Sequence, residues 1–425
     1  MQERLHEIVD HLFRRESGKM IAVLSKLLGF QNLQTAQDIA QDTLLQALHT
    51  WSYKGAPDNP AAWLYRVAKN KAIDFLRREK IFRSVRLHHA YLLQSEYTLN
   101  PTVHSYFEEG AIEDSQLRMM FACCHPSIPA DSQIALALKI LCGLSVSEIA
   151  NAFLKDEETI AKRIYRAKEK IREENVGLEL PSLYQLPKRL DAVLHCLYIL
   201  FNEGYNSSHP QQLIREELCE EAMRMAYMLT QTPLTNLPRT NALLALFCFQ
   251  ASRLKARLDE NGNIMLLKHQ DRSKWYRPLI QKGFSFLEEA TQNETSVYHL
   301  EAAIAYMHAI APCFEATNWN AIHYLYKILA AEHPTPFIAL NKAIAASYVT
   351  GKEAALIELQ QIKCLENYYL YHTVIGEICF DLHRKEDAQH HYRKALSLTR
   401  SLAEQQLLQD KIKSCTDDFT AFSLP

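Results

Sequence analysis

Glycine is scarce in this chain, with 11 in 425 residues, and stretches that alternate apolar and polar residues are rare. Both observations argue against a fold built on strands and tight turns. The chain also lacks a run of about 18 apolar residues, the length that a membrane-spanning helix needs. Its start, MQERLHEIVD, has no apolar core of a signal peptide. We therefore expect a soluble cytoplasmic protein with no membrane partner.

Paired cysteines are missing as well. The ten cysteines are scattered, and none forms a C-x-x-C motif. Cys123, Cys124 and His125 are adjacent, so on one helical turn they cannot all converge on one metal ion. This usage indicates reduced thiols that serve as small core residues. We predict no metal and no other cofactor.

No strong charge of either sign distinguishes the whole chain. Its formal net charge is −2, so any surface for nucleic acid must be local. What is abundant is helical periodicity, because apolar residues recur at helical spacing almost throughout. The pattern predicts an all-α fold, and the length suggests two or three domains. Early helices are expected over 36–51 and 61–80.

The helix expected over 61–80 opens a basic segment. Between Arg66 and Arg86 there are eight basic residues and two acidic ones, with Trp63, Tyr65 and Phe75 nearby. Cations suit phosphates and flat rings suit unpaired bases, so this segment could face DNA. The alternative is a solvated basic face over aromatic core residues. The next 30 residues, 87–116, contain no Lys or Arg and five acidic residues, which predicts an acidic linker.

A second DNA-binding pattern begins at Ser145, three residues before Glu148, the spacing of a capping box for a helix over 148–154. A polar break at Lys155 and Asp156 precedes a longer helix, basic near its start. Its inner face is expected to comprise Ile160, Ile164, Ala167 and Ile171. Two such helices joined by a tight turn are typical of a helix-turn-helix, although an ordinary helical hairpin is the alternative.

Repeated helix pairs are predicted near the end of the chain. Small and aromatic residues share one set of offsets in two segments 33 residues apart. They are Ala343, Ala346, Ala355, Leu359 and Ile362, and then Gly376, Cys379, Ala388, Tyr392 and Ala395. This period is typical of tetratricopeptide-like units. Such arrays present a surface to a protein or peptide partner.

Two polar motifs interrupt the helices between these patterns. In FNEGYNSS, Asn202, Glu203 and Gly204 follow an apolar run, which suits either a helix stop at a joint or a catalytic carboxylate. In HQDRSKW, Asp271 and Arg272 suit either a polar joint between helices or a binding hot spot.

Three segments in order resemble a bacterial RNA polymerase sigma factor of the extracytoplasmic-function (ECF) group. DIAQDTLLQALHTW resembles region 2.2, NPAAWLYRVAKNKAIDFLRR resembles regions 2.3 and 2.4, and LSVSEIANAFLKDEETIAKRIYRAKEKI resembles region 4.2. The further segments RRESGKMIAVL, LRMMFACCHPSIP, FNEGYNSS, LLALFCFQASRLKAR and HQDRSKW resemble a subgroup with a long helical extension. The resemblance covers nearly the whole chain.

The resemblance implies roles for individual residues. Asp38, Asp42 and Gln46 would bind the clamp helices of the largest polymerase subunit, and region 4 would contact its flap. Asn70 would read a flipped base of the minus-10 promoter element, since an amide can bond a base edge in two places. The residues expected to hold the phosphates there are Arg66, Lys69, Arg77 and Arg78. Those expected at the minus-35 element are Thr159, Lys162, Arg163 and Arg166.

The expected organisation has five parts. These are a region 2 domain over 1–86, an acidic linker over 87–114, a region 4 domain over 115–178, a helical extension over 179–335 and repeats over 336–425. The chain would then be a sigma factor and no enzyme, with an extension that regulates it in place of a membrane anti-sigma factor. Its partners would be RNA polymerase core and promoter DNA. The alternatives are a helix-turn-helix regulator with a sensory repeat domain, and an enzyme that uses Glu203.

Overall fold

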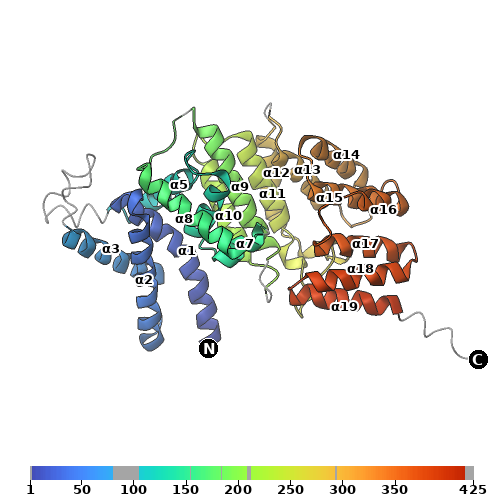
Figure 1. The fold of residues 1–425 in the computed structure, drawn as a ribbon, viewed down its shortest axis with the longest axis horizontal. Coiled ribbons are helices and arrows are strands. Elements are labelled where there is room, and N and C mark those ends of the chain that lie inside the picture. Colours follow the sequence, from blue (N-terminus) through green and yellow to red (C-terminus); the bar gives the residue numbers. More distant parts are fainter. Residues whose placement is uncertain are drawn as a thin grey trace, which may run out of the picture. The chain divides into compact units, whose positions relative to one another are not determined.

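The computed structural model describes residues 2–79, 105–153, 155–182, 184–207, 212–291 and 294–416. Within these ranges every regular element is a helix, apart from one isolated antiparallel bridge between Leu258 and Ile264. The predicted all-α fold is confirmed (Figure 1). Among the described helices none is both long and apolar enough to span a bilayer. Most of the expected acidic linker lies outside the described residues.

The chain divides into two compact units. The first comprises residues 1–200 and 220–235, and the second comprises 201–219 and 236–425. Two of the three boundaries fall within the helices α9 (Leu186–Tyr205) and α10 (Glu216–Thr230), and the third follows α10. Each unit is described separately below.

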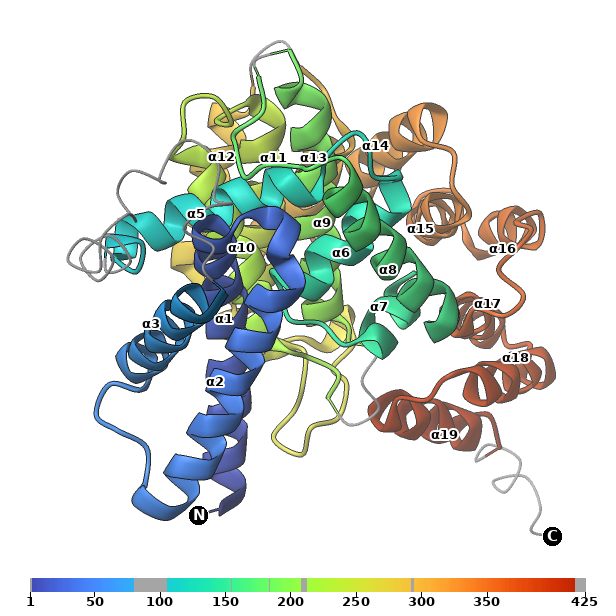
Figure 2. The same cartoon turned by 60° about the vertical axis from the view of Figure 1, so that its left-hand side comes forward.

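The first unit begins with a bundle of three helices: α1 (Gln2–Leu28), α2 (Leu33–Lys54) and α3 (Pro60–Glu79). Both α2 and α3 pack against α1, and Figure 2 shows α1 and α2 side by side. The chain turns between α1 and α2 at Gly29, whose positive φ of 86° suits glycine, and at the short helix η1 (Phe30–Asn32). The Asn32 side chain donates to the Leu28 oxygen (2.8 Å), which satisfies a carbonyl at the end of α1.

Four further helices follow the undescribed segment: α5 (Glu109–Cys123), α6 (Ala130–Ile140), α7 (Val146–Ala152) and α8 (Glu157–Glu173). Residues 109–114, expected in the linker, thus form the start of α5. The predicted inner face of α8 is confirmed, because Ile160, Ile164, Ala167 and Ile171 are all buried. Full burial of an isoleucine side chain is worth about 1.5–3 kcal/mol, so this stripe stabilises the packing of α8 against α6 and α7.

A glycine inside α1 lets that helix approach the end of α6. A Cβ atom added at Gly18 would lie 2.1 Å from the backbone oxygen of Leu141. No side chain fits there, and a backbone atom cannot rotate away as a side chain can. The three-helix bundle and the α5–α8 segment therefore meet through direct backbone contact.

The second unit is an array of helices: α11 (Pro238–Ala251), α12 (Arg277–Glu289), α13 (Val297–Ile310) and α14 (Trp319–Glu332), then α15 (Pro336–Ser347), α16 (Lys352–Gln360), α17 (Tyr369–Asp381), α18 (Lys385–Leu398) and α19 (Leu402–Thr416). In both views α17, α18 and α19 stack in series (Figures 1 and 2). In the segment LDENGNI the bridge between Leu258 and Ile264 closes a turn around Gly262.

The predicted repeats are confirmed as the helix pairs α15–α16 and α17–α18. At the shared offsets Ala343, Ala355 and Leu359 are buried in the first pair, as are Ala388 and Tyr392 in the second. A Cβ at the equivalent Gly376 would lie 2.6 Å from the Tyr392 ring, so the glycine makes room for this aromatic side chain. Only Ile362, the residue that replaces a small one, is less than fully buried.

Changing Gly18 to alanine should destabilise the first unit, because the new methyl group must push the Leu141 backbone away. We expect a loss of roughly 1–3 kcal/mol, as for other overpacked sites, measured as a lower midpoint in urea denaturation. The control is Gly110→Ala in α5, where an added Cβ meets no atom within 4 Å. That variant should be neutral or more stable, since alanine favours a helix. Equal midpoints for the two variants would contradict the close packing.

Candidate nucleic-acid interface

The helix α3 presents one apolar and one polar face. Its start is set by Asn59, whose side chain accepts from the Ala62 N–H (3.0 Å), and by Pro60 at the first helical position. The buried residues of α3, which form its apolar face, are Leu64, Ala68, Ala72, Ile73 and Leu76. Arg66 and Asn70, four residues apart, are exposed on the other side. The sequence pattern thus places the predicted minus-10 residues on a solvent face.

The other basic residues predicted for this interface also lie on α3. Arg77 and Arg78 are exposed in its last turn, and Lys69 is half-buried. Arg77 lies 3.9 Å from Asp74, an exposed ion pair that a phosphate could replace at little cost. Cations dominate the face, so α3 can attract a polyanion.

Trp63 is part of an aromatic cluster in the bundle. Its ring meets that of Trp51 edge-on at 5.4 Å, and Trp51 in turn lies 5.8 Å from Phe13. The geometry agrees with the interpretation of Trp63 as a core anchor, because edge-to-face contacts of this kind stabilise aromatic clusters.

The helix α2 exposes the three residues predicted to bind polymerase. Asp38, Asp42 and Gln46 lie one helical turn apart, and all are exposed. Two large apolar side chains accompany them, Leu45 at 55% and Leu48 at 40% exposure. The sequence reasoning missed these leucines, although their place in DIAQDTLLQALHTW shows them. A polar row with exposed leucines is typical of a surface that binds another protein.

The helix-turn-helix prediction is confirmed by its caps. Ser145 caps α7 and forms a capping box with Glu148, as the spacing predicted. Asp156 caps α8, accepting from the Thr159 N–H (2.7 Å) and from its hydroxyl (2.8 Å). The hydroxyl predicted to face the major groove therefore has a partner in its own helix.

The remaining residues predicted for the minus-35 element differ in whether their side chains are paired within the protein and in how exposed they are. Lys162 pairs with Glu158 (2.6 Å), and Arg163 pairs with Asp131 (2.9 Å) at the start of α6. Arg166 is exposed and has no partner among the described residues. The Lys162 pair is exposed and weak, so DNA can compete with it, whereas the Arg163 side chain is only 21% exposed. Arg166 is the most available cation of the set.

Polar contacts connect the α7–α8 segment to the first three-helix bundle inside the first unit. Lys168 of α8 donates to Gln34 (3.0 Å) and Gln37 (2.5 Å) at the start of α2. Burial, with the charge of Lys139 nearby, lowers the pKa of Lys168. Arg14 of α1 pairs with the cap residue Glu148 at 3.2 Å. Sequence reasoning did not find these contacts, because nothing in local periodicity pairs residues more than 130 positions apart.

A third contact joins α1 to α5. Lys26 pairs with Asp114 (2.6 Å), which also accepts from Arg118. Burial alone would raise the pKa of Asp114, but the hydrogen bonds from Arg118 and Lys26 hold it below its usual value. The carboxylate therefore stays charged, and the pair links the two segments at neutral pH.

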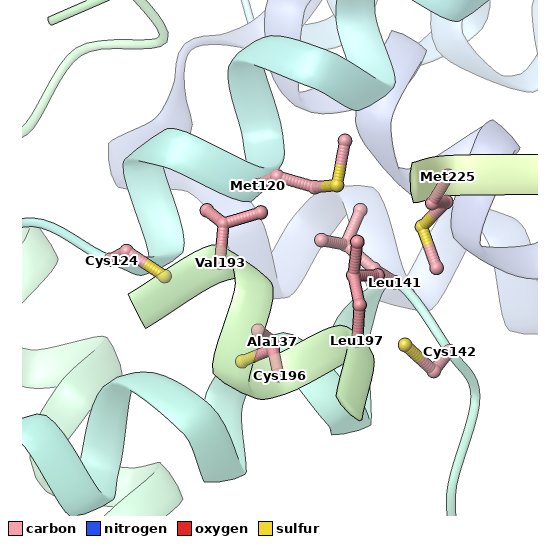
Figure 3. A pocket seen from close by; sticks show the side chains of 9 residues that line it. All are labelled: Met120, Cys124, Ala137, Leu141, Cys142, Val193, Cys196, Leu197 and Met225. Carbon is pink, nitrogen blue, oxygen red and sulfur yellow. The ribbon is translucent and has the colours of Figure 1, made fainter. Parts of the chain in front are cut away.

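Sulfur-containing side chains line a small cavity in the first unit (Figure 3). Met120 and Cys124 come from the end of α5, Cys142 follows α6, Cys196 belongs to α9 and Met225 to α10. A hydrogen bond with Cys124 and burial both raise the pKa of Cys196. All ten cysteines are free and eight are buried, which confirms the interpretation as core thiols. No group of three or more metal-binding side chains occurs among the described residues.

Residues 201–205 of the FNEGYNSS motif form the last turn of α9. The helix ends at Tyr205, so the expected helix stop lies within this motif, one residue after Gly204. A Cβ at Gly204 would lie 2.7 Å from the Cys219 nitrogen and 2.9 Å from the Arg215 oxygen. The glycine is needed because a second stretch of backbone crosses α9 there. That crossing is held by a hydrogen bond from the Arg215 N–H to the Gly204 oxygen (2.7 Å).

Glu203 is a structural carboxylate. It is 5% exposed, accepts from the Ser207 hydroxyl (3.1 Å) and lies 4.0 Å from the Arg215 guanidinium. Asn202, by contrast, is exposed. An enzyme that uses Glu203 would need polar partners such as Arg272 within hydrogen-bond reach of it, but Arg272 donates instead to the His308 backbone. Asp271 caps the short helix η5 (Arg272–Lys274), accepting from the Ser273 N–H (2.8 Å).

Comparisons with known proteins agree with this geometry. Residues 12–81 match the family model of sigma-70 region 2, and 118–171 match that of sigma-70 region 4. Residues 189–291 match a family of unknown function. No solved structure matches the chain significantly.

Two curated proteins are similar to the chain. An uncharacterized protein of Rhizobium meliloti (strain 1021) is 35% identical over 390 residues, which cover 91% of this chain and 92% of that protein. The ECF RNA polymerase sigma factor SigE of Mycolicibacterium smegmatis is 26% identical over 165 residues, covering 39% of this chain and 60% of that protein.

Two sigma-70 domains in order, on the helices that carry the exposed basic faces, define a promoter-recognition protein. The chain belongs to the ECF-type sigma factors and carries a C-terminal extension. It directs RNA polymerase core to promoter DNA and takes part in transcription initiation; it is not itself an enzyme.

Replacing Glu203 with glutamine should destabilise the protein before it alters transcription. The change leaves the buried Arg215 with one charged partner fewer, at an expected cost of about 1–3 kcal/mol, seen as a lower melting temperature. Glu217→Gln is the control, because Glu217 also pairs with Arg215 (3.1 Å) but is partly exposed. The Glu217→Gln variant should lose less stability than Glu203→Gln. Normal melting with lost transcription would mean that Glu203 is part of a switch.

Proposed function

We propose that α3 reads the minus-10 element, with Asn70 on the flipped base and with Arg66, Lys69, Arg77 and Arg78 on the phosphates. The support is the exposed face described above, on which an amide stands among cations. Phosphate contacts position a protein on DNA, and base contacts specify the sequence. An exposed asparagine at the centre of such a face suits the second task.

For the minus-35 element the proposal assigns different tasks to the residues of α8. Arg166 contacts phosphate, since it is exposed and unpaired among the described residues. Lys162 reaches the groove by exchanging Glu158 for DNA. Thr159 and Arg163 hold the local structure through Asp156 and Asp131. They contact DNA when they release these partners. The proposed DNA-reading domains keep the boundaries 1–86 and 115–178.

The proposed polymerase surface is the face of α2 that carries Asp38, Asp42 and Gln46. Docking on the clamp helices would bury Leu45 and Leu48, and the apolar area removed from water would add to the charge interactions. Region 4 would meet the flap. Run-off transcription of fragmented genomic DNA with the full chain and bacterial core polymerase tests the whole assignment, which fails if no promoter-specific transcript forms.

We also propose that the extension restrains region 4. Two helices that belong to the segment after region 4 pack inside the first unit. Arg224 of α10 donates to Gln116 of α5 (3.1 Å), and the Cys196 thiol of α9 lies 4.0 Å from the Ile134 oxygen of α6. The sulfur-lined cavity is shared by the same four helices (Figure 3).

The contacts between α8 and α2 support this restraint. Promoter elements at minus-10 and minus-35 lie about 25 base pairs apart, roughly 80 Å of duplex at 3.4 Å per pair. Hydrogen bonds of 2.5–3.0 Å join α8 to α2, and α2 packs against α3. While these bonds hold, α3 and α8 cannot lie on both elements at once. Release of Lys168 from Gln34 and Gln37 is therefore a step that promoter binding requires, and the extension can control it.

Asn70→Ala should abolish discrimination at the minus-10 element, because it removes the amide that reads the base. Loss of one good base contact costs about 1–3 kcal/mol, roughly 5- to 150-fold in the preference for the cognate base. Run-off transcription from matched and mutated promoters measures this, and core binding should persist. The control is Asn320→Ala, an exposed amide of α14. Loss of core binding by Asn70→Ala would show that this residue supports the fold.

Opening the contacts between α8 and the first bundle should raise transcription. Arg14→Ala combined with Gln37→Ala removes the α1 and α2 side of two contacts without altering α8. Partly exposed pairs contribute about 0.2–1 kcal/mol each, so an increase of about two- to tenfold is expected in run-off assays. Lys413→Ala, which removes an exposed local ion pair in α19, should change nothing. Unchanged or lower output from the double variant would refute the restraint.

A further inference from the structure

Three arginines of the second unit gather around the rings of Tyr205 and Trp275. The Arg257 guanidinium carbon lies 3.9 Å from the centre of the Tyr205 ring, and that of Arg253 lies 5.5 Å from it. Arg253 also lies 6.0 Å from the centre of the Trp275 ring, which Arg272 approaches to 4.1 Å. Cations and rings thus alternate in the order Arg257, Tyr205, Arg253, Trp275, Arg272. We call this arrangement the arginine ladder.

No carboxylate neutralises the arginine ladder in the part of the chain that the structure describes. Arg257 donates to the backbone oxygen of Tyr205 and Arg272 to that of His308, while the Arg253 side chain makes no hydrogen bond among the described residues. Burial lowers the pKa of Arg272, and the nearby Arg253 adds to the effect. Like charges in a poorly hydrated site repel strongly, because little water screens them.

Two acids act on the ladder through their charge without forming an ion pair with it: Glu315 near Arg272, and Glu404 near Arg257. Glu404 is already engaged. Glu404 accepts hydrogen bonds from Thr399 (2.5 Å) and from the Tyr369 hydroxyl. Burial raises its pKa, although the charge of Arg257 opposes this. Glu404 therefore stabilises the packing of α17 and α19 and is not an ion-pair partner of the ladder.

Buried polar atoms around the ladder also lack partners among the described residues. These atoms are Arg272 Nη2, Trp275 Nε1, Tyr205 Oη, Gln270 Oε1 and His308 Nδ1. Four of them can donate a hydrogen bond. A buried donor without an acceptor costs about 1–3 kcal/mol, so a cluster of them indicates a missing ion or ligand group.

His308 adds no positive charge to this cluster. Burial, followed by the charges of Arg253 and Arg272, lowers its pKa to about 3. The imidazole is thus neutral near pH 7, and its free Nδ1 can donate or accept. The positive charge of the site comes from the three guanidinium groups alone.

We propose that the arginine ladder binds the oxyanion group of a small molecule, a carboxylate or a phosphate. Guanidinium groups match both in shape and charge, and a bidentate pair places two N–H donors on two oxygens. The anion would neutralise the repulsion among the arginines and accept from the orphan donors of Arg272, Trp275 and Tyr205. Binding itself does not depend on the proposed restraint of region 4; only its effect on transcription would.

The ligand is expected to be small because the unpartnered atoms are buried, so only a compact group can reach them. The hollow beside the ladder, with a volume of about 320 Å³, is not the anion site. Its lining includes Asp259, Glu260 and Asp271, which repel anions. The competing explanation is a joint in which cation–π stacking alone holds the helices. Substitution of Arg253 distinguishes the two explanations, because a joint held by cation–π stacking alone gains no stability when an anion is added.

Thermal melting of the full chain tests the proposal with inorganic phosphate and with citrate as probes, each against sodium chloride of equal ionic strength. At ten times its dissociation constant a specific anion should raise the melting temperature of the second unit by a few degrees. Arg253→Gln should abolish this rise and Arg253→Lys should keep part of it. Arg393→Gln, which removes an exposed arginine of α18, should respond like the unaltered chain.

The melting experiments decide whether the arginine ladder binds a small anion. A rise with phosphate alone, citrate alone or both supports the site and distinguishes the two oxyanion classes. The same rise in Arg253→Gln, or none in the unaltered chain, overturns the proposal, as does binding of an acidic peptide without binding of either small anion. Should Arg253→Gln fail to fold, Arg272→Lys and phosphate titration of tryptophan fluorescence in the unaltered chain provide the same test. None of these readouts depends on transcription.

Discussion

Close approach of helix backbones is the constraint on which this protein depends. In an all-α chain two helices can approach until side chains collide, and closer only where a side chain is missing. At Gly18, Gly204 and Gly376 an added Cβ would lie 2.1, 2.7 and 2.6 Å from a neighbouring atom. Gly18 allows the first bundle to pack against the α5–α8 segment. Gly204 allows the backbone of residues 215–219 to cross α9, and Gly376 leaves room for the Tyr392 ring. At these three positions crowding requires a glycine, whereas Gly110 has open space beside it.

Two basic helices with the same general task are built differently. On α3 the cations stand on an open face, where the ion pair between Arg77 and Asp74 is long and exposed. On α8 Lys162, Arg163 and Lys168 all have partners within the protein. Binding of DNA by α8 must therefore exchange internal contacts for external ones. Because each of these contacts is weak, breaking them costs little free energy. Packing that stabilises the first unit can still control the exchange.

How well the site could be predicted depended on the range of the interaction. The capping box at Ser145, the buried stripe of α8 and the repeat offsets around Gly376 were all correct, because periods of three to four residues determine them. The helix end predicted near Gly204 is present, but the packing that requires a glycine there was not predicted. The neighbour of Gly204, the backbone of residues 215–219, is brought there by the return of the chain, which no local pattern reveals.

The sequence by itself determined the helices, their caps, the two DNA-reading segments and the family, because each rests on residues close together along the chain or on motifs in order. Only the tertiary structure decided which charges are available. It pairs Arg163 with Asp131, joins Lys168 to α2 and leaves Arg253 between two rings with no counter-ion among the described residues. The physical reason is that the energy of a charge depends on what surrounds it in space, and that environment is assembled from segments far apart in the chain.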